Sequence, residues 1–337
     1  MSDTTRIPIT EAETLLEQVF SANGVLPASA TSVACALVAA EAEGQVGHGF
    51  SRVNDYVAQL RSGKVDGAAV AQLNVDGPGA ATIDARDGFA YPALDTGIDW
   101  GIDAARMQGT AAFAIHRSHH CGALSVQVDR IARAGLVAMM VANSPAAIAP
   151  WGSKTPVFGT NPIAFAAPRA DGPPLVIDLS LSRVARGKVM HAKKSGKPIP
   201  EGWALDRDGA PTTDPDAALE GTMVPIGEAK GTALALMVEV LAASFAGANT
   251  SPHVNSFFTA EGPPCGAGQF VLILRPADPD AFTARMESLL ALIEHQDGAR
   301  LPGSRRIAAL NASRENGVLV SSHYLETAKR LSDAADA

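Results

Sequence analysis

The stretch TAAFAIHRSHHCGAL, Thr110 to Leu124, places a short apolar strand directly before a loop of histidines. Six consecutive residues, His116 to Cys121, contain three of the chain's eight histidines and one of its three cysteines. A G-x-G-x-x-G turn follows neither this strand nor any other, and G-x-x-x-x-G-K-[ST] and G-x-S-x-G are absent. The sequence therefore does not support a Rossmann fold, a P-loop or the commonest hydrolase elbow.

Three interpretations of the histidine cluster are open. A zinc site needs three or four converging ligands, usually with a carboxylate or a second cysteine. The stretch before these histidines is predicted as a strand that ends in a loop, so no H-x-x-x-H helix forms, and no nearby Asp or Glu completes such a set; we therefore expect no metal. A purely structural loop is the second interpretation. We favour a ligand-facing loop, because a strand end rich in His, Ser and Gly supplies hydrogen-bond donors and close backbone approach.

Composition restricts the partners and the compartment. The formal charge of −8 over 337 residues provides no basic surface for nucleic acid. The N-terminal MSDTTRIPIT lacks the order of a signal peptide, and the longest apolar run, Ala233 to Ala246, contains Glu239 and is too short to span a bilayer. Three widely spaced cysteines are typical of a reduced protein. We expect no membrane association and a cytoplasmic location.

The spacing of apolar residues predicts helices first, then strands with few helices between them. Helices are expected from a capping box at Thr10 to about Gly24 and over the ranges 29–43, 52–61, 91–107, 126–134 and 230–245, with a helical region from 279 onward. Strands are expected over 81–84, 110–115, 136–142, 163–167, 175–179 and 269–274. Strands outnumber the helices between them, so a regular βαβ winding is not expected.

A second constellation is Gly47 to Arg52, at the start of a predicted helix. His48 stands between two glycines, and imidazole donates or accepts a proton near neutral pH. Arg52 lies one helical turn on, and a guanidinium grips a carboxylate with two hydrogen bonds. The pair suits a substrate with a carboxylate beside its reacting carbon. A surface histidine with a solvated arginine is the alternative.

Together these stretches resemble one family, the malate/L-lactate dehydrogenases that lack a Rossmann fold. Family-like phrases follow one another in the family's order from about residue 10 to 306: HGFSRVNDYVAQLRSGKV, SHHCGAL, ANSPAAIAPWG, FGTNPIAFAAP, DLSLS, ARGKV, PEGWALDRDGAPTTDP, KGTALALMVEVL and LPGSRR. The resemblance implies an α/β (α+β) fold. A mixed, largely antiparallel cofactor-binding sheet domain, expected over 76–275, would join a helical domain built from both chain ends, 1–75 and 276–337. The helical domain would carry substrate binding and dimerisation in a homodimer.

The resemblance also implies an NAD(P)-dependent oxidoreductase that acts on the carbon next to a carboxylate. Members reduce 2-oxo acids or cyclic imines, and include sulfolactate, ureidoglycolate and diketogulonate oxidoreductases. Of the site residues it implies, His48 is the catalytic proton donor, Arg52 the carboxylate anchor and His120 a further active-site residue. The residues expected at the cofactor are His119, His120, Cys121, Gly122, Ala123, Asp178, Leu179, Ser180, Gly303, Arg305 and Arg306. Those expected beside the substrate, with Arg52, are Asn143, Thr160 and Lys188.

Two positions depart from the family pattern. Gly47 stands where the family usually has Ser, and Lys188 where imine-reducing members have Asp. A lysine there suits a second anionic group, as in malate or sulfolactate, whereas SHH and DRDG-x-PT resemble the imine reductases. From the sequence we favour reduction of piperideine-2-carboxylate or pyrroline-2-carboxylate. A 2-hydroxy acid dehydrogenase and a catalytically silent cofactor-binding protein are the alternatives. NADP(H) is preferred over NAD(H), because Arg305 and Arg306 suit a 2′-phosphate.

Overall fold

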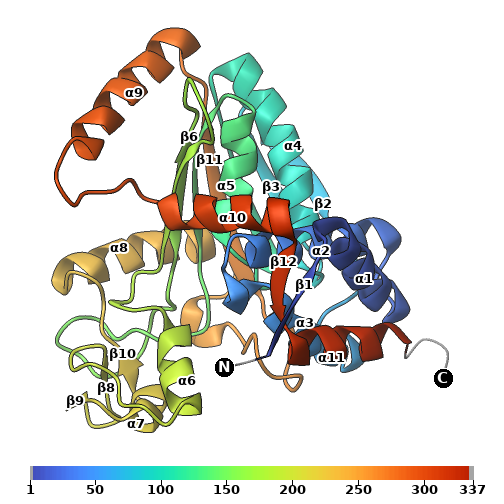
Figure 1. The fold of residues 1–337 in the computed structure, drawn as a ribbon, viewed down its shortest axis with the longest axis vertical. Coiled ribbons are helices and arrows are strands. Elements are labelled where there is room, and N and C mark those ends of the chain that lie inside the picture. The colour runs from blue at the N-terminus through green and yellow to red at the C-terminus, as the bar shows by residue number, and fades with distance from the viewer. Residues whose placement is uncertain (1–2, 334–337) are drawn as a thin grey trace.

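The computed structural model describes residues 3–333, which form a central sheet, a helical group beside it and a smaller group below it (Figure 1). None of the helices within that range is long and apolar enough to cross a membrane.

The helical group joins both ends of the chain. Strand β1 pairs antiparallel with β12, with Thr4 opposite Ser321 and Ile7 opposite Val318. The helices of this group pack around the ribbon, and their apolar faces share one core. The two strands and four helices are β1 (Thr4–Ile7), β12 (Val318–Ser321), α1 (Ile9–Ala22), α2 (Pro27–Ala42), α3 (Val53–Arg61) and α11 (Ser322–Asp333). The ribbon explains why a helical domain includes residues from both chain ends.

The central sheet has seven strands in the order β2-β3-β4-β11-β5-β6-β7. Only β3 and β4 are parallel neighbours, and the other pairs are antiparallel. The strands span β2 (Gln72–Gly77), β3 (Ala80–Asp84), β4 (Thr110–Ser118), β5 (Val137–Ala142), β6 (Ile163–Ala167), β7 (Leu175–Leu179) and β11 (Ala267–Leu274). The prediction of a mixed, largely antiparallel sheet without a Rossmann fold is confirmed.

Alternate residues of the strands face two different cores. Phe113, Met140 and Val271 pack with α4 (Ala90–Gln108) and α5 (Leu124–Arg133) on one face. Val141 and Phe270 point to the opposite face, where α8 (Ala229–Glu239) and the π-helix η3 (Val240–Phe245) lie. A period of two along each strand thus buries the sheet on both sides.

The smaller group continues the core on the α8 side of the sheet. It contains a three-stranded sheet in the order β10-β8-β9, together with helices α6 and α7. Its elements are α6 (Arg186–Lys194), β8 (Ala204–Leu205), β9 (Pro211–Thr212), α7 (Pro215–Glu220) and β10 (Thr222–Met223). The sequence patterns did not predict these short elements.

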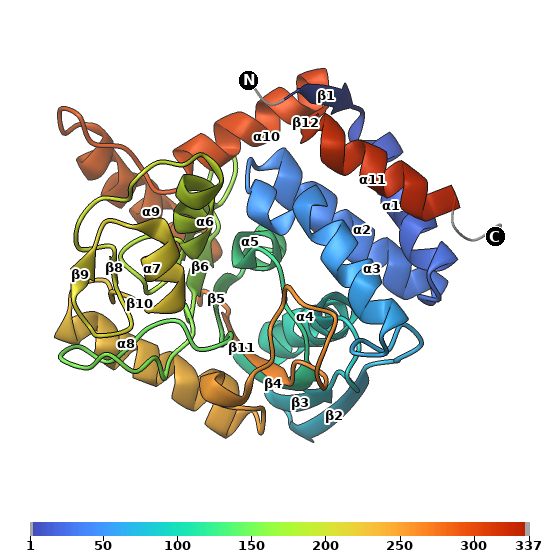
Figure 2. The same cartoon turned by 90° about the horizontal axis from the view of Figure 1, so that it is seen from below.

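The next two helices after β11 pack at different places in the fold. Helix α9 (Pro279–Glu294), capped by the Asp278 carboxylate on Ala281 N, projects from one end of the sheet (Figure 1). Helix α10 (Ser304–Asn316) returns along the helical group, as Figure 2 shows from below. The predicted division at residues 75 and 276 therefore groups α9 with helices that it does not join in one core.

The predicted elements differ from the structure mainly at their ends. The capping box at Thr10 is wrong: Pro8 takes the N-cap position and α1 begins at Ile9, so Thr10 already lies inside the helix. Strand β4 runs beyond Ile115 to Ser118, and the range 230–245 divides into α8 and the π-helix η3.

Candidate active site

A tight turn between α2 and α3 carries the first predicted site residues. The turn consists of two 3-10 helices, η1 (Val46–His48) and η2 (Phe50–Arg52). Buried Glu41 of α2 holds it, because its Oε2 accepts a hydrogen bond from Phe50 N at 2.7 Å. Burial raises the pKa of Glu41 to about 7, against the effect of that hydrogen bond. The carboxyl group therefore fixes the backbone directly after Gly49.

The turn brings His48 to the histidine cluster. The His48 and His120 rings are stacked, with centroids 5.2 Å apart and planes 8° apart. Burial, and then the positive charge of Arg52, lowers the pKa of His48 to about 4 and that of His120 well below its usual value. Nδ1 of His48 is buried and has no hydrogen-bond partner among residues 3–333. The two imidazoles are thus a neutral pair at physiological pH.

Two tyrosines, to which the sequence assigned no functional role, form hydrogen bonds next to this histidine pair. Tyr56 Oη lies 2.6 Å from His120 Nδ1 and 3.0 Å from Tyr91 Oη. Burial raises the pKa of Tyr56 to about 12, so its hydroxyl stays protonated. Tyr56 lies on the apolar face of a helix, where its spacing indicates only a core residue, and nothing in the sequence places its hydroxyl against His120.

Arg52 lies beside the histidines and is almost fully buried. Its Nη1 is 3.1 Å from Asp55 Oδ2, its Nη2 donates to the Phe257 carbonyl, and its guanidinium carbon lies 4.4 Å from the Phe258 ring centroid. Its Nε has no hydrogen-bond partner. A fixed guanidinium with an unused N–H is suited to orient a small carboxylate.

The segment 254–266 forms a wall of this site that the sequence did not predict. It follows the 3-10 helix η4 (Ser251–His253) and reaches over to α3 (Figure 2). Buried Lys64 donates from Nζ to the carbonyls of Ser256, Thr259 and Glu261 at 2.8, 2.9 and 3.1 Å. The segment thereby holds the Phe257 ring 5.2 Å from the His120 ring, centroid to centroid.

The rest of the SHHCGA loop is largely structural. His119 is buried and its Nε2 lies 2.8 Å from Gln59 Oε1, so this nitrogen is engaged within the protein. Cys121 and Ala123 are also buried, and burial raises the pKa of the Cys121 thiol to about 12. Gly122 has a φ of +70°, and a Cβ there would lie 2.8 Å from Tyr91 Oη. Of the residues predicted in this loop, His120 is the one whose side chain reaches the site.

The residues predicted at the cofactor meet at one edge of the sheet. Asp178 Oδ2, at the end of β7, accepts from Ser125 N at 2.8 Å and so occupies the start of α5. A Cβ on Gly303, before α10, would lie 2.8 Å from the carbonyl of Val176 in β7. Leu179 is 40% exposed beside them, with Ser180 half-buried. An exposed leucine and a close backbone approach at a strand end suit a flat ring system.

Arg306 has a largely buried guanidinium group at the same edge of the sheet. Its Nη1 lies 2.5 Å from Glu43 Oε1, and Nη2 lies 3.8 Å from Asp129 Oδ1. Nε and Nη2 lack hydrogen-bond partners, whereas Arg305 is exposed. Burial, and then nearby Glu43, raises the pKa of Asp178 to about 6. Arg306 is engaged with carboxylates, so Arg305 is the freer of the two predicted phosphate ligands.

The three predicted substrate residues have different surroundings. Asn143 is buried, donating to Asn249 O and accepting from Gly268 N, which is a structural role. Thr160 N donates to Ser144 Oγ at 3.0 Å. Lys188 is exposed in the first turn of α6. The geometry thus leaves Lys188 as the predicted substrate residue with a free charged group.

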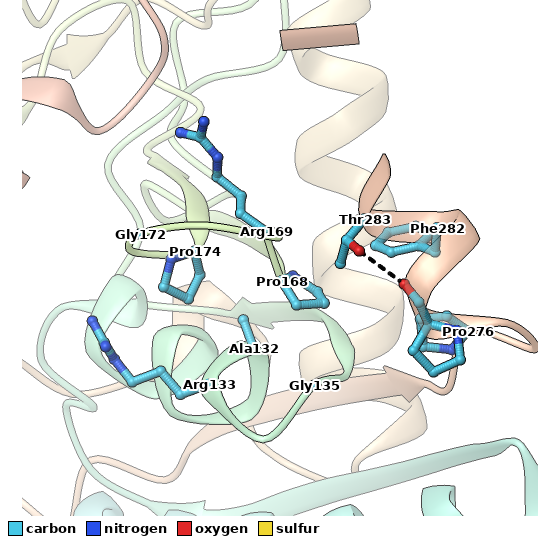
Figure 3. A pocket seen from close by; sticks show the side chains of 11 residues that line it. Ala132, Arg133, Gly135, Pro168, Arg169, Gly172, Pro174, Pro276, Phe282 and Thr283 are labelled. Carbon is cyan, nitrogen blue, oxygen red and sulfur yellow. Dashed lines mark hydrogen bonds between the residues drawn. The ribbon is translucent and has the colours of Figure 1, made fainter. Parts of the chain in front are cut away.

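A surface pocket of about 440 Å³ lies elsewhere, at the base of α9. Figure 3 shows Pro168, Pro276 and Phe282 around it, with the guanidinium groups of Arg133 and Arg169 directed to different sides. It contains no histidine, and Arg169 and Arg133 pair with Glu287 and Asp129. Among the residues from 3 to 333, no three His, Cys, Asp or Glu side chains converge as a metal site.

A neutral histidine pair and a buried arginine on a mixed sheet make an acid–base site for a small carboxylate. His, Tyr and Arg side chains cannot accept a hydride, so redox chemistry here requires a bound cofactor. The exposed end of β7, the start of α10 and the exposed Arg305 fit a dinucleotide. This combination defines a class of oxidoreductases built without a Rossmann fold.

Comparison with known proteins identifies the family. The malate/L-lactate dehydrogenase family model matches residues 7–328, and the chain belongs to that family. It is 51% identical over 303 residues, 90% of this chain and 91% of the relative, to a (2R)-3-sulfolactate dehydrogenase (NADP(+)) of Chromohalobacter salexigens. It is 40% identical over 338 residues, 98% of each chain, to a Δ1-pyrroline-2-carboxylate/Δ1-piperideine-2-carboxylate reductase of Pseudomonas putida.

A solved structure has the same fold. The Δ1-piperideine-2-carboxylate reductase from Pseudomonas syringae pvar. tomato superimposes with a TM-score of 0.91 at 37% identity, over 97% of this chain and 99% of that one. The predicted family and enzyme class are thereby confirmed, and the chain is an oxidoreductase of the dehydrogenase and reductase type.

Proposed function

We propose that this protein is an NADP(H)-dependent dehydrogenase of a 2-hydroxy acid that carries a second anionic group, of the 3-sulfolactate type. The observation that carries the proposal is the 51% identity to a sulfolactate dehydrogenase that names NADP(+). The exposed Lys188, and Gly47 in place of the serine usual in the family, agree with it. The order of the two substrate classes favoured by the sequence is thereby reversed. Reduction of a cyclic imine is the second candidate, supported by the 40% identical reductase.

Arg52 and His48 each have a chemical role in this reaction. A bound nicotinamide supplies or accepts the hydride. Arg52 holds the carboxylate so that one face of the α-carbon is presented. His48, neutral and next to Arg52, takes the hydroxyl proton during oxidation and returns it during reduction. A bound carboxylate offsets the charge of Arg52, and this raises the pKa of His48 toward the working range.

A substrate panel tests the proposal. Sulfolactate, malate and lactate are oxidised with NADP(+) or NAD(+), and the two cyclic imines are reduced with NADPH or NADH. We expect sulfolactate with NADP(+) to give the highest kcat/KM by at least about tenfold, which corresponds to roughly 1.4 kcal/mol. A higher kcat/KM for either imine would establish the second candidate. Replacement His48→Ala should reduce turnover at least about 10²-fold and leave NADPH affinity intact.

We also propose a homodimer, formed through the outer face of α8 and η3 and not through the helical domain that the sequence favoured for dimerisation. The side chains of Leu236, Met237, Val240 and Phe245 are exposed there, and the only charged residue between 231 and 249 is the buried Glu239. A helix face in contact with water carries polar and charged residues, so a continuous uncharged apolar face indicates that protein covers it. A helix pair related by a two-fold axis would bury the face on both copies.

The oligomeric state is measured by light scattering after size-exclusion chromatography. Leu236→Glu should yield a monomer, whereas Val70→Glu, at an isolated exposed valine, should leave the dimer intact. A wild-type monomer, or a dimer that survives Leu236→Glu, would remove this face as the interface.

A further inference from the structure

We propose that Tyr56 and Tyr91 are positioning residues that fix the proton of His120 on Nε2, so that His120 donates a hydrogen bond to the reacting oxygen or nitrogen and leaves proton transfer to His48. The inference rests on the proposed function only in placing His120 at the active site. It assigns the two stacked histidines different tasks, although both are half-buried imidazoles.

The three groups form one chain of contacts. Tyr91 Oη lies 3.0 Å from Tyr56 Oη, which lies 2.6 Å from His120 Nδ1. Both tyrosine side chains are buried, with 2% or less of each residue exposed. The Tyr56 ring packs 5.2 Å from the Phe89 ring, centroid to centroid, so its hydroxyl has little freedom to turn elsewhere. The chain therefore ends on a ring nitrogen whose protonation it determines.

The direction of the hydrogen bonds follows from counting protons. Each tyrosine hydroxyl has one proton, and Tyr91 Oη has no hydrogen-bond partner other than Tyr56 within residues 3–333. If His120 Nδ1–H donated to Tyr56, one of the two tyrosine protons would be buried without an acceptor, because the contact between Tyr56 and Tyr91 uses only one of them. An unsatisfied buried donor costs about 1–3 kcal/mol. The opposite direction, Tyr91 to Tyr56 to His120, leaves no hydroxyl proton without an acceptor.

The position of the chain is fixed from two further sides. Gly122, in the loop that carries His120, lies so close to Tyr91 Oη that a Cβ there would be 2.8 Å away. Tyr91 therefore contacts the same loop whose histidine it orients through Tyr56. On the other side, the guanidinium carbon of Arg52 lies 5.5 Å from the Tyr56 ring centroid. Carboxylate anchor, tyrosine and histidine thus lie side by side in one cluster.

Burial, and then the positive charge of Arg52, lowers the pKa of His120 and keeps it neutral. Arg52, His48 and His119 are the titratable groups that act on it, and burial and these three all lower its pKa. A neutral imidazole with Nδ1 engaged as an acceptor has one N–H, at Nε2. Such a group stabilises developing negative charge without changing protonation state. His48, whose Nδ1 is without a hydrogen-bond partner, has no comparable partner to fix its tautomer.

The direct test is the tautomer of His120 in the ligand-free protein. Labelling with 15N-histidine gives signals from only eight histidines, and His120→Gln identifies the signal of interest. We expect an unprotonated Nδ1 and a protonated Nε2 in the wild type, and a mixture of both tautomers in Tyr56→Phe. A wild-type proton on Nδ1 would overturn the proposal. This measurement needs no turnover, so its failure is distinct from a failure of the proposed function.

Kinetics supply the second readout. Tyr56→Phe keeps the ring in its aromatic core and removes one hydrogen bond, so kcat should fall about three- to tenfold. Substrate KM and NADPH affinity should change less than twofold. Tyr91→Phe should have the same effect in weaker form, and Tyr324→Phe, the third tyrosine of the chain, should have none. Equal kcat in Tyr56→Phe and Tyr324→Phe, both folded by thermal melting, would contradict the role of the tyrosines.

Discussion

The Glu41 carboxylate occupies the space into which any side chain at Gly49 would extend, because a Cβ there would lie 2.0 Å from Glu41 Oε2. The same oxygen accepts the hydrogen bond of Phe50 N at 2.7 Å. One carboxyl group thus sets the path of the turn, with His48 before Gly49 and Arg52 after it. The positions of the acid–base group and the carboxylate anchor depend on a residue that touches neither substrate nor cofactor.

Gly49→Ala should therefore impair catalysis through the position of the turn. We expect kcat/KM to fall at least about tenfold, because displacement of reacting groups by about 1 Å is costly. Gly47→Ala is the matched control, since a Cβ there meets nothing within 4 Å, and its activity should equal that of the wild type. Steady-state kinetics of the two variants decide the matter, and equal activities would show that the turn tolerates the extra methyl group.

The sequence predicts the bounds of strands in the central sheet well, but it does not predict which strands pair across the chain. Strands β6 and β7 have the predicted bounds, because five consecutive residues of strand composition lie between turn residues. Strands β1 and β12 contain only four residues each and pair with each other across nearly the whole chain. No local pattern encodes such a pairing, since the partner of each strand lies at the opposite end of the sequence.

The site shows the same limit at the level of side chains. His48 and His120 are conspicuous in the sequence because of their glycine and histidine neighbours, and the structure brings their rings together. Tyr56 and Lys64 have helical or loop positions that favour core packing or solvation. Their roles depend on which atoms lie opposite them, a hydroxyl against an imidazole and an ammonium among three carbonyls. Tertiary contact alone determines that.

Arg52→Lys should separate substrate binding from chemistry. A lysine retains the positive charge but loses the planar fork and the stacking on Phe258, so the carboxylate is held less firmly. We expect substrate KM to rise about tenfold, the equivalent of roughly 1.4 kcal/mol, with a smaller change in kcat. Initial rates over a range of substrate concentrations provide both values. A normal KM would mean that another group anchors the carboxylate.

Lys64→Met should release the wall segment 254–266 from α3. The ammonium of Lys64 is the donor to three backbone carbonyls, and the lysine is 2% exposed. Loss of these charge-assisted bonds should lower the free energy of unfolding by about 2–4 kcal/mol. We expect faster proteolytic cleavage within 255–262 than in a control, Lys197→Met, at an exposed lysine. Identical cleavage rates would mean that other contacts hold the segment.

Glu41→Gln should change how stability depends on pH. Burial raises the pKa of Glu41 from 4.5 to about 7 in the folded protein, so between these values the folded state binds more protons than the unfolded state. The contribution of Glu41 is therefore full below about pH 4.5, by its ordinary pKa, and is lost as pH rises through about 7.

Glutamine does not titrate but still offers an oxygen to Phe50 N. Relative to Glu41→Gln, the wild type should lose roughly 1.4 kcal/mol of unfolding free energy per pH unit across that window. Urea unfolding of both proteins at a series of pH values measures the difference between their free energies of unfolding. Both proteins contain the same histidines, so the opposite pH trends of those histidines cancel in this difference. A difference that stays constant between pH 4.5 and pH 7 would show that Glu41 is ionised throughout, and that the carboxylate accepting from Phe50 N carries a full negative charge in the folded protein.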